Sequence, residues 1–329
     1  MTNQNTAPRS VSRSSVALAP ALLFTLALGC SSSSDGKQVT EQHVSDAGPS
    51  STYSGPEPKI PAAPDVCPVL QTGTVSVLGK DVKMWVGEKQ PDKKGPVLFY
   101  WHGTGSTADE ISAFMNTAQN PILDEIQQEG GIAVSFTDTI KTGDNTGNLV
   151  WYTGDYDIAD VILACAVQQL NIDTRRIYAA GCSAGGLEVG TMALMRSSYL
   201  AAVIPNSGGQ ILPGNATFDD PSHVPAVMTA HGTYANDYVI LHFIDWSKKL
   251  DQEIVGAGGM AVDCTHPNGH CMIFPPASGT NTIDPGEVIA AQWQFLKDHP
   301  FGVSKDPYAD GLPSSFPSFC EKVSVGGDQ

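Results

Sequence analysis

The segment Arg176–Gly186, RIYAAGCSAGG, constrains the fold of this chain more than any other stretch. An apolar run of the kind that forms a buried strand stops at Gly181, and a helix-like segment begins at Leu187. Between them Ser183 stands among small residues in a Gly-x-Ser-x-Gly pattern. This pattern is typical of a strand–turn–helix that holds its serine on a strained, exposed turn. Larger side chains beside the serine would clash where the strand and the helix pack closely.

Strands and helices are predicted to alternate along the chain. Thr74–Val86 alternates apolar and polar residues and predicts a hairpin. Apolar runs predict further strands at Pro96–Trp101, Gly131–Phe136, Ala201–Asn206, Val224–Ala230 and Cys271–Phe274. Helical segments are predicted at Asp109–Glu125 (with a break at Pro121), Asp157–Leu170, Tyr238–Val255 and Pro285–Asp298. Such alternation is typical of an α/β fold with a doubly wound, mostly parallel sheet.

The first residues have the composition of an export signal. Arg9 and Arg13 stand in a stretch without acidic residues, and the apolar run Val16–Leu28 follows. We therefore predict a signal peptide over residues 1–29. Cys30 and the serines after it resemble a bacterial lipoprotein signal, in which the cysteine becomes lipid-modified after cleavage; plain secretion is the alternative.

The signal is followed by a segment that is rich in Ser, Pro and Gly. Residues 30–66 contain few large apolar side chains and are predicted to be a flexible tether, because they bury too little surface to offset the entropy of ordering. Residues 67–329 are long enough for one large catalytic domain. No second long apolar run follows, so we expect membrane contact only through a lipid anchor.

The chain is strongly acidic. Its formal charge is −16, and loss of Arg9 and Arg13 with the signal changes this to −18. Such a charge argues against nucleic acid as a partner and against attraction to anionic lipid. It favours a neutral substrate, which can be a small molecule or a polymer.

The cysteines that remain after Cys30 are even in number: Cys67, Cys165, Cys182, Cys264, Cys271 and Cys320. In an oxidising compartment they are predicted to pair in disulfides, although Cys165 on its apolar helix also fits a free thiol. The one pair that can be argued locally is Cys264–Cys271, which would close a short loop. Cys264, His266, His270 and Cys271 do not have the spacing of a metal site, so no metal and no cofactor are expected.

A serine hydroxyl needs a base to become a nucleophile, and the base needs a carboxylate to orient it. In α/β-hydrolases the chain order is serine, acid, histidine, with each residue on a loop after a strand. His270 stands immediately before the apolar residues 272–274 and is the preferred base. His266 on the same loop is the alternative.

The acid is expected between the serine and the histidine. Asp237 lies in the loop that opens at His231 and Gly232, after the predicted strand Val224–Ala230. It is the preferred acid, with Asp263 and Asp245 as alternatives. Asp237 can also be interpreted as a cap of the helix that is predicted from Tyr238.

An early glycine loop, His102-Gly103-Thr104-Gly105, follows the strand Pro96–Trp101. Stabilising a tetrahedral oxyanion needs two fixed N–H groups, and we assign them to Thr104 and Ala184. Aromatic residues near these loops are candidates for lining a substrate pocket, and packing in the core or the loops is an equally good interpretation: Trp101, Trp151 and Tyr152.

Residues 69–301 resemble secreted α/β-hydrolase esterases that are grouped with polyhydroxybutyrate depolymerases, feruloyl esterases and acetylxylan esterases. The similar stretches are PVLFYWHGTGS (96–106), IDTRRIYAAGCSAGG (172–186), PAVMTAHGTYANDYV (225–239) and NGHCMIFP (268–275). The resemblance implies Ser183 as nucleophile, Asp237 as acid and His270 as base. Residues 234–236 look like an insertion before the acid, and Cys271 replaces the usual apolar residue after the histidine.

The resemblance implies a serine esterase that forms an acyl-enzyme. The expected substrates are polyesters such as polyhydroxybutyrate, or acetyl and feruloyl esters of plant polysaccharide. One rival is a serine peptidase on the same fold, although no motif for holding a peptide amine is present. Another rival is a binding lipoprotein that has kept the fold and lost catalysis.

Overall fold

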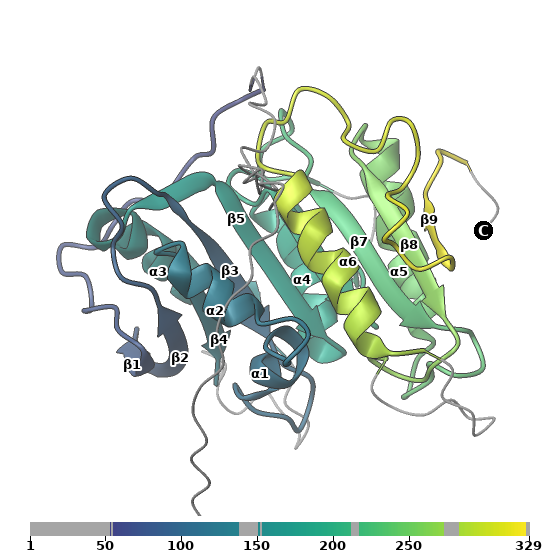
Figure 1. Cartoon of the computed structure of the whole chain (residues 1–329), viewed down its shortest axis with the longest axis horizontal. Coiled ribbons are helices and arrows are strands. Elements are labelled where there is room, and N and C mark those ends of the chain that lie inside the picture. Colours follow the sequence, from purple (N-terminus) through teal and green to yellow (C-terminus); the bar gives the residue numbers. More distant parts are fainter. Residues whose placement is uncertain are drawn as a thin grey trace, which may run out of the picture. The chain divides into compact units, whose positions relative to one another are not determined.

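The computed structural model describes residues 53, 55–137, 151, 153–211, 217–272 and 283–326, all within the compact unit Ser50–Gln329. Its centre is a nine-stranded sheet with the strand order β1-β2-β4-β3-β5-β6-β7-β8-β9 (Figure 1). The strands are β1 (Gly73–Val77), β2 (Lys80–Val86), β3 (Gly95–Trp101), β4 (Ile132–Phe136), β5 (Ile172–Cys182), β6 (Ala202–Asn206), β7 (Ala226–Gly232), β8 (Ala261–His266) and β9 (Cys320–Lys322).

The middle of the sheet is parallel and its borders are antiparallel. Strands β4, β3, β5, β6, β7 and β8 run parallel to one another, whereas β2 pairs antiparallel with β4, and β9 with β8. Every residue of β3, β4, β6 and β7 is buried. This burial explains why these strands are continuous apolar runs in the sequence, since parallel strands are covered on both faces.

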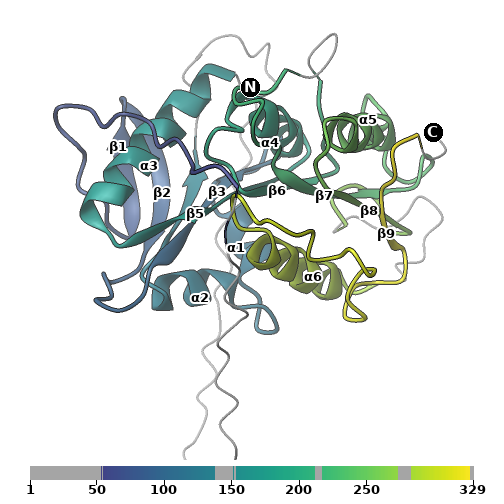
Figure 2. The same cartoon turned by 90° about the horizontal axis from the view of Figure 1, so that it is seen from above.

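Helices cover both faces of the sheet (Figure 2). The helices α3 (Tyr156–Gln169), α4 (Ala184–Met195) and α5 (Phe243–Gly256) lie on one face. The helices α1 (Glu110–Met115), α2 (Ile122–Gln128) and α6 (Pro285–Asp298) lie on the other, and the short 3-10 helix η1 (Thr153–Asp155) precedes α3. Each face therefore has its own apolar core.

Most of the predicted elements are confirmed, and two differ. The expected hairpin is β1 and β2, and the expected break at Pro121 separates α1 from α2. The predicted strand at Cys271–Phe274 is wrong for its first two residues, because Cys271 and Met272 lie in a turn, and its other two residues lie outside the described residues. A strand that was not predicted, β8, precedes this turn. Because Asp263 and Thr265 interrupt the apolar pattern of β8, the sequence did not predict this strand. Helix α5 begins at Phe243, so residues 238–242 belong to the preceding loop.

The carboxyl ends of the parallel strands bring separate loops to one edge of the sheet. Strand β3 ends at Trp101, β5 at Cys182 and β7 at Gly232. The loops that follow carry Gly103, Ser183 and Asp237, and the loop after β8 carries His270. In open α/β sheets this edge is where ligands bind.

The segment expected to be a tether is in part described. Lys59 forms an ion pair of 2.6 Å with Asp220, and Glu57 forms one with Arg175. Residues 55–66 therefore contact the domain. The expected signal peptide and Cys30 lie outside the described residues. Within the described part of the chain, none of the helices is both long and apolar enough to cross a membrane.

The cysteines pair differently from the local expectation. The disulfides are Cys67–Cys165, Cys182–Cys271 and Cys264–Cys320. The predicted bond Cys264–Cys271 is wrong, because Cys264 lies in β8 directly opposite Cys320 of β9, whereas Cys271 faces the end of β5. Strand β9 comes from the C-terminal segment, for which the sequence showed no strand pattern.

Candidate active site

Ser183 occupies a strained turn between β5 and α4. Its backbone angles are φ 58° and ψ −121°, a conformation that residues other than glycine rarely adopt. Its N–H donates to the carbonyl of Asn206 at 3.0 Å, which ties the turn to the end of β6. Strain of this kind persists where the surrounding structure enforces it, and it is common at functional sites.

Two glycines make this turn possible. A Cβ at Gly185 would lie 1.8 Å from the carbonyl oxygen of Trp101, and one at Gly181 would lie 2.6 Å from the same atom. Strand β3 and helix α4 are therefore in backbone contact beside Ser183. This close approach is the reason for the Gly-x-Ser-x-Gly pattern.

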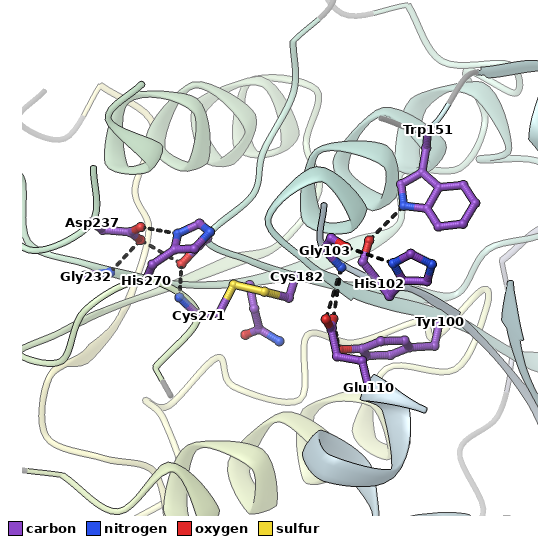
Figure 3. Close-up of a disulfide and its surroundings, with 12 residues drawn as sticks. Tyr100, His102, Gly103, Glu110, Trp151, Cys182, Gly232, Asp237, His270 and Cys271 are labelled. Carbon is purple, nitrogen blue, oxygen red and sulfur yellow. Dashed lines mark hydrogen bonds and ion pairs between the residues drawn. A yellow bond between two sulfur atoms is a disulfide. The ribbon is translucent and has the colours of Figure 1, made fainter. Parts of the chain in front are cut away.

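Asp237 and His270 meet at the neighbouring strand ends. Nδ1 of His270 lies 2.6 Å from Oδ1 of Asp237, and the carboxylate is fully buried (Figure 3). Since a carboxylate oxygen can only accept, Nδ1 carries the proton. The other ring nitrogen, Nε2, is then the acceptor of the neutral imidazole, which is the arrangement that a general base needs.

Two further donors hold the carboxylate of Asp237. Oδ2 accepts from the hydroxyl of Ser207 at 2.7 Å and from the N–H of Gly232 at 3.0 Å. Burial acts to raise the pKa of Asp237, but the bonds from His270, Ser207 and Gly232 outweigh it and keep the pKa below its usual range. Asp237 is therefore ionised and fixed.

Ser207 connects the acid to the histidine loop. Its hydroxyl donates to Asp237 and accepts from the N–H of Cys271 at 2.7 Å. It follows the end of β6 with φ 38°, a second positive value at this edge of the sheet. Sequence reasoning missed Ser207. Its position directly after the strand Ala202–Asn206 was the available signal.

A disulfide joins the serine turn to the histidine loop. Cys182 precedes Ser183, Cys271 follows His270, and their Cα atoms are 5.9 Å apart (Figure 3). The two sulfur atoms and one ring nitrogen of His270 lie within 4.8 Å of one another. His270 is thus held beside the residue that precedes Ser183. Because the two cysteines are bonded to each other, they offer no thiolates to a metal.

The loop after β3 lies against Ser183. A Cβ at Gly103 would be 3.4 Å from Cβ of Ser183, and Thr104 is the next residue. Ala184 is the first residue of α4, so its N–H has no acceptor within the helix. The two residues that we expected to provide oxyanion donors are therefore carried by elements on either side of Ser183.

The carboxylate of Glu110 binds the backbone of this loop. Both of its carboxylate oxygens accept from the N–H of Gly103, at 3.1 and 3.2 Å, and one also accepts from the hydroxyl of Tyr100 at 2.9 Å (Figure 3). The N–H of Gly103 is thereby occupied, so Gly103 itself is not a candidate oxyanion donor. Sequence reasoning missed Glu110, although it opens the helix that follows the glycine loop.

The expectations for the three aromatic residues have different outcomes. Trp101 is wholly buried and stacks on Phe136 at 3.7 Å, so it is a core residue and cannot line a pocket. Trp151 is also buried, and its Nε1 donates to the carbonyl of His102 at 2.8 Å. Its ring also packs edge to face against Trp101 and His102, which agrees with the packing interpretation. Tyr152 lies outside the described residues.

The alternative base and acids are engaged elsewhere. His266 is buried and bonds the carbonyl of Asn268 through Nδ1, and burial lowers its pKa to about 4. Asp263 pairs with His231 at 3.1 Å. Asp245 lies in the first turn of α5. The structure thus brings together the preferred acid and base, Asp237 and His270.

No protein-family model matches this chain, and no curated protein sequence is significantly similar to it. Solved structures do resemble it. The structure of native sOPH has a TM-score of 0.56 at 16% identity and covers 80% of this chain and 96% of its own. The structure of native pOPH has a TM-score of 0.54 at 18% identity and covers 79% of this chain and 96% of its own. A pOPH variant described as a complex of pNPB has a TM-score of 0.56 at 16% identity and covers 80% of this chain and 96% of its own. These likenesses and the strand order show that this chain has the α/β-hydrolase fold.

Proposed function

We propose that this protein is a serine esterase that hydrolyses carboxylic esters through an acyl-enzyme. The observation that carries the proposal is the 2.6 Å contact between His270 and the buried Asp237, on a loop that a disulfide joins to the residue before Ser183. A strained serine, a histidine and an ionised carboxylate on the loops after β5, β8 and β7 form the set of groups that acyl transfer requires.

In the proposed reaction Ser183 Oγ attacks the ester carbonyl carbon, and its proton passes to Nε2 of His270. Asp237 stabilises the imidazolium that forms. The N–H groups of Thr104 and Ala184 donate to the oxyanion. The intermediate collapses, the C–O bond to the alcohol breaks, and the leaving oxygen takes the proton from His270. Water then attacks the acyl-enzyme in the same manner, releasing the acid and restoring Ser183.

Exposed apolar side chains on the loop of Asp237 support an apolar ester as the substrate. Tyr234, Tyr238, Val239 and Ile240 are all exposed, Ile240 by 86%. We call them the loop patch. His242 orders the patch, because its ring stacks on Tyr234 at 3.5 Å and its Nδ1 bonds the Tyr234 carbonyl. The loop holds no other charged residue than the buried Asp237, which favours a neutral aliphatic polyester over a charged or sugar-rich substrate.

Polymer adsorption tests the substrate proposal. Replacing Ile240 and Tyr238 with serine should weaken binding to solid polyhydroxybutyrate while hydrolysis of a soluble short-chain ester persists. Val325, which is exposed on the C-terminal segment, provides the matched control substitution. Unchanged adsorption, or equal activity on methyl ferulate and on acetylated xylan, would contradict the polyester preference.

We also propose export by the signal of residues 1–29 and membrane attachment through a lipid on Cys30. The basic start, the apolar run and the cysteine support it. The disulfides of the domain are compatible with an oxidising compartment. Cys30→Ala should release the protein from the membrane fraction of the producing cell. If the variant stayed with the membrane, the lipid anchor would be wrong.

A non-catalytic binding protein is the rival, and a fluorophosphonate probe distinguishes the two. The probe reacts with an activated serine, so wild type should be labelled while Ser183→Ala and His270→Ala are not. Ser247→Ala, which removes a buried hydroxyl that bonds the Gly208 carbonyl, should be labelled like wild type and serves as the folding control. A folded wild type that resists the probe would favour the binding role.

A further inference from the structure

We propose that His231 is a positioning residue that keeps Asp237 in place by holding the peptide backbone of Gly232. The inference rests on the proposed function, because it assigns His231 a part in the same reaction. His231 lies at the end of β7, and Gly232 is the last residue of that strand.

Both ring nitrogens of His231 face acceptors. Nδ1 lies 2.9 Å from the carbonyl oxygen of Gly232, and Nε2 lies 3.1 Å from Oδ1 of Asp263 on β8. The histidine is fully buried and the carboxylate nearly so. A carbonyl oxygen can only accept, so Nδ1 carries the proton of the bond to Gly232. The contact of Nε2 with Asp263 is an ion-pair distance without hydrogen-bond geometry, and it favours a second proton on the ring.

The surroundings support this charge state. Burial acts to lower the pKa of His231, but the contacts with Asp263, Gly232 and Asp237 outweigh it and raise the pKa. Burial likewise opposes ionisation of Asp263, and His231 and Thr265 outweigh it and lower that pKa. Both pKa shifts therefore favour the charged forms of this buried pair.

Three other titratable side chains interact electrostatically with this pair. His266, beside it in β8, has its pKa lowered to about 4 by burial and by the charge of His231, so it is neutral. Burial, and then the charge of Asp263, raise the pKa of Asp251 on α5 well above its usual value. Lys248, on the same helix, favours the ionised form of Asp263.

Gly232 transmits the contact to Asp237. Its carbonyl accepts from His231, and its N–H, on the other side of the same Cα, donates to Oδ2 of Asp237 at 3.0 Å. The fit is close, since a Cβ on Gly232 would lie 2.9 Å from Cβ of Asp237. Fixing the carbonyl restricts rotation about this Cα, so the N–H stays directed at the carboxylate.

Two amide substitutions separate the contacts of His231. In His231→Asn the amide nitrogen replaces Nδ1 and can donate to Gly232, but the contact with Asp263 is lost. In His231→Gln the amide nitrogen replaces Nε2 and can donate to Asp263, but Gly232 is released. Leaving Asp263 buried and unpaired destabilises a protein more than losing a neutral contact. The Asn variant should therefore be the less stable of the two, and also the more active.

The following measurements distinguish a positioning role of His231 from a purely structural one. His231→Gln should lower kcat at least about tenfold with KM changed less than about threefold, as when an interaction of the transition state is lost. The far-downfield proton resonance of the His270–Asp237 bond should weaken or move in the Gln variant and persist in the Asn variant. His223→Gln, a half-buried histidine that bonds the Leu200 carbonyl, is the matched control and should change neither readout.

The proposal is supported if His231→Asn is less stable but more active than His231→Gln. It is overturned if the more stable of the two variants is also the more active. If either variant fails to fold, a measurement on the wild-type protein tests the proposal. Nitrogen NMR of the labelled histidines should show His231 with a proton on Nδ1 at neutral pH, and a ring without a proton on Nδ1 would overturn the proposal. This measurement and the His270 proton resonance need no substrate, so they remain informative if the esterase proposal itself fails.

Discussion

Cys182 and Cys271 are bonded to each other, and each is the chain neighbour of a proposed catalytic residue. Ser183 follows the first cysteine and His270 precedes the second. The bond closes a separation of 89 residues and fixes the serine turn against the histidine loop. The positions of nucleophile and base relative to each other are therefore set covalently as well as by packing.

Breaking this disulfide should reduce activity by more than the accompanying loss of stability explains. We expect the double variant Cys182→Ala/Cys271→Ala to lose at least about tenfold in kcat, since small misplacements of reacting groups are costly. Its stability should fall by about 2–4 kcal/mol. The matched control, Cys264→Ala/Cys320→Ala, breaks a bond at the sheet border and should lose stability but retain kcat. Equal kcat values in both double variants would contradict this role.

Ser207→Ala should impair the acid. The substitution removes a donor to Asp237 and an acceptor for the N–H of Cys271. A hydrogen bond to a charged group contributes about 1.5–3 kcal/mol, so we expect kcat/KM to fall by roughly ten- to a hundredfold. Ser247→Ala removes another buried hydroxyl, which donates to the Gly208 carbonyl, and should leave kcat/KM nearly unchanged. Steady-state kinetics on a soluble ester provide the comparison, and similar values for both variants would argue against Ser207.

Glu110→Ala should loosen the oxyanion loop. Without the carboxylate the N–H of Gly103 loses its acceptor and Thr104 its fixed position. Removing an oxyanion donor typically lowers kcat about a hundredfold, and we expect a loss of up to that size. Glu110→Gln keeps one acceptor oxygen and should be impaired less. Asp109→Asn, which removes only an exposed charge paired with Lys83, is the control. An active Glu110→Ala enzyme would exclude the proposed role.

A buried carboxyl on helix α4, that of Glu188, should make stability depend on pH. Burial, together with the nearby Asp155, raises the pKa of Glu188 from 4.5 to about 8. The folded protein therefore binds a proton that the unfolded chain releases between these pH values, so stability should fall as pH rises through this window. Glu188→Gln should remove up to about 3 kcal/mol of that fall between pH 5 and 7. Thermal melting of wild type, Glu188→Gln and the exposed-site control Glu321→Gln across the window measures it. Equal slopes in all three proteins would refute the assignment.

The sequence was sufficient for the features that depend on local pattern. The buried parallel strands are continuous apolar runs, and the Gly-x-Ser-x-Gly turn needs glycines because β3 and α4 approach within backbone contact. Asp237 could be chosen because it follows a predicted strand, and His270 because it stands before the apolar residues 272–274; both come after Ser183 in the chain order typical of the fold. Strand β8 was missed because Asp263, a member of a buried ion pair, breaks its apolar pattern.

The remaining features depend on contacts between distant segments. Cys264 pairs with Cys320 because β9 returns beside β8, and no local spacing indicates that. Ser207 and Glu110 act through single hydrogen bonds to other loops, and the residue types alone do not reveal these partners. Trp101 was misjudged as a possible pocket residue because an aromatic at the end of a strand can face either the site or the core, and here it stacks on Phe136.

Hydrolysis of p-nitrophenyl acetate, butyrate and octanoate by wild type and Ser183→Ala tests the central claim most directly. The account predicts turnover by wild type, an initial burst of p-nitrophenol when the acyl-enzyme accumulates, and loss of both in the folded variant. Turnover that survives in Ser183→Ala, or a folded wild type that hydrolyses none of these esters, would contradict it.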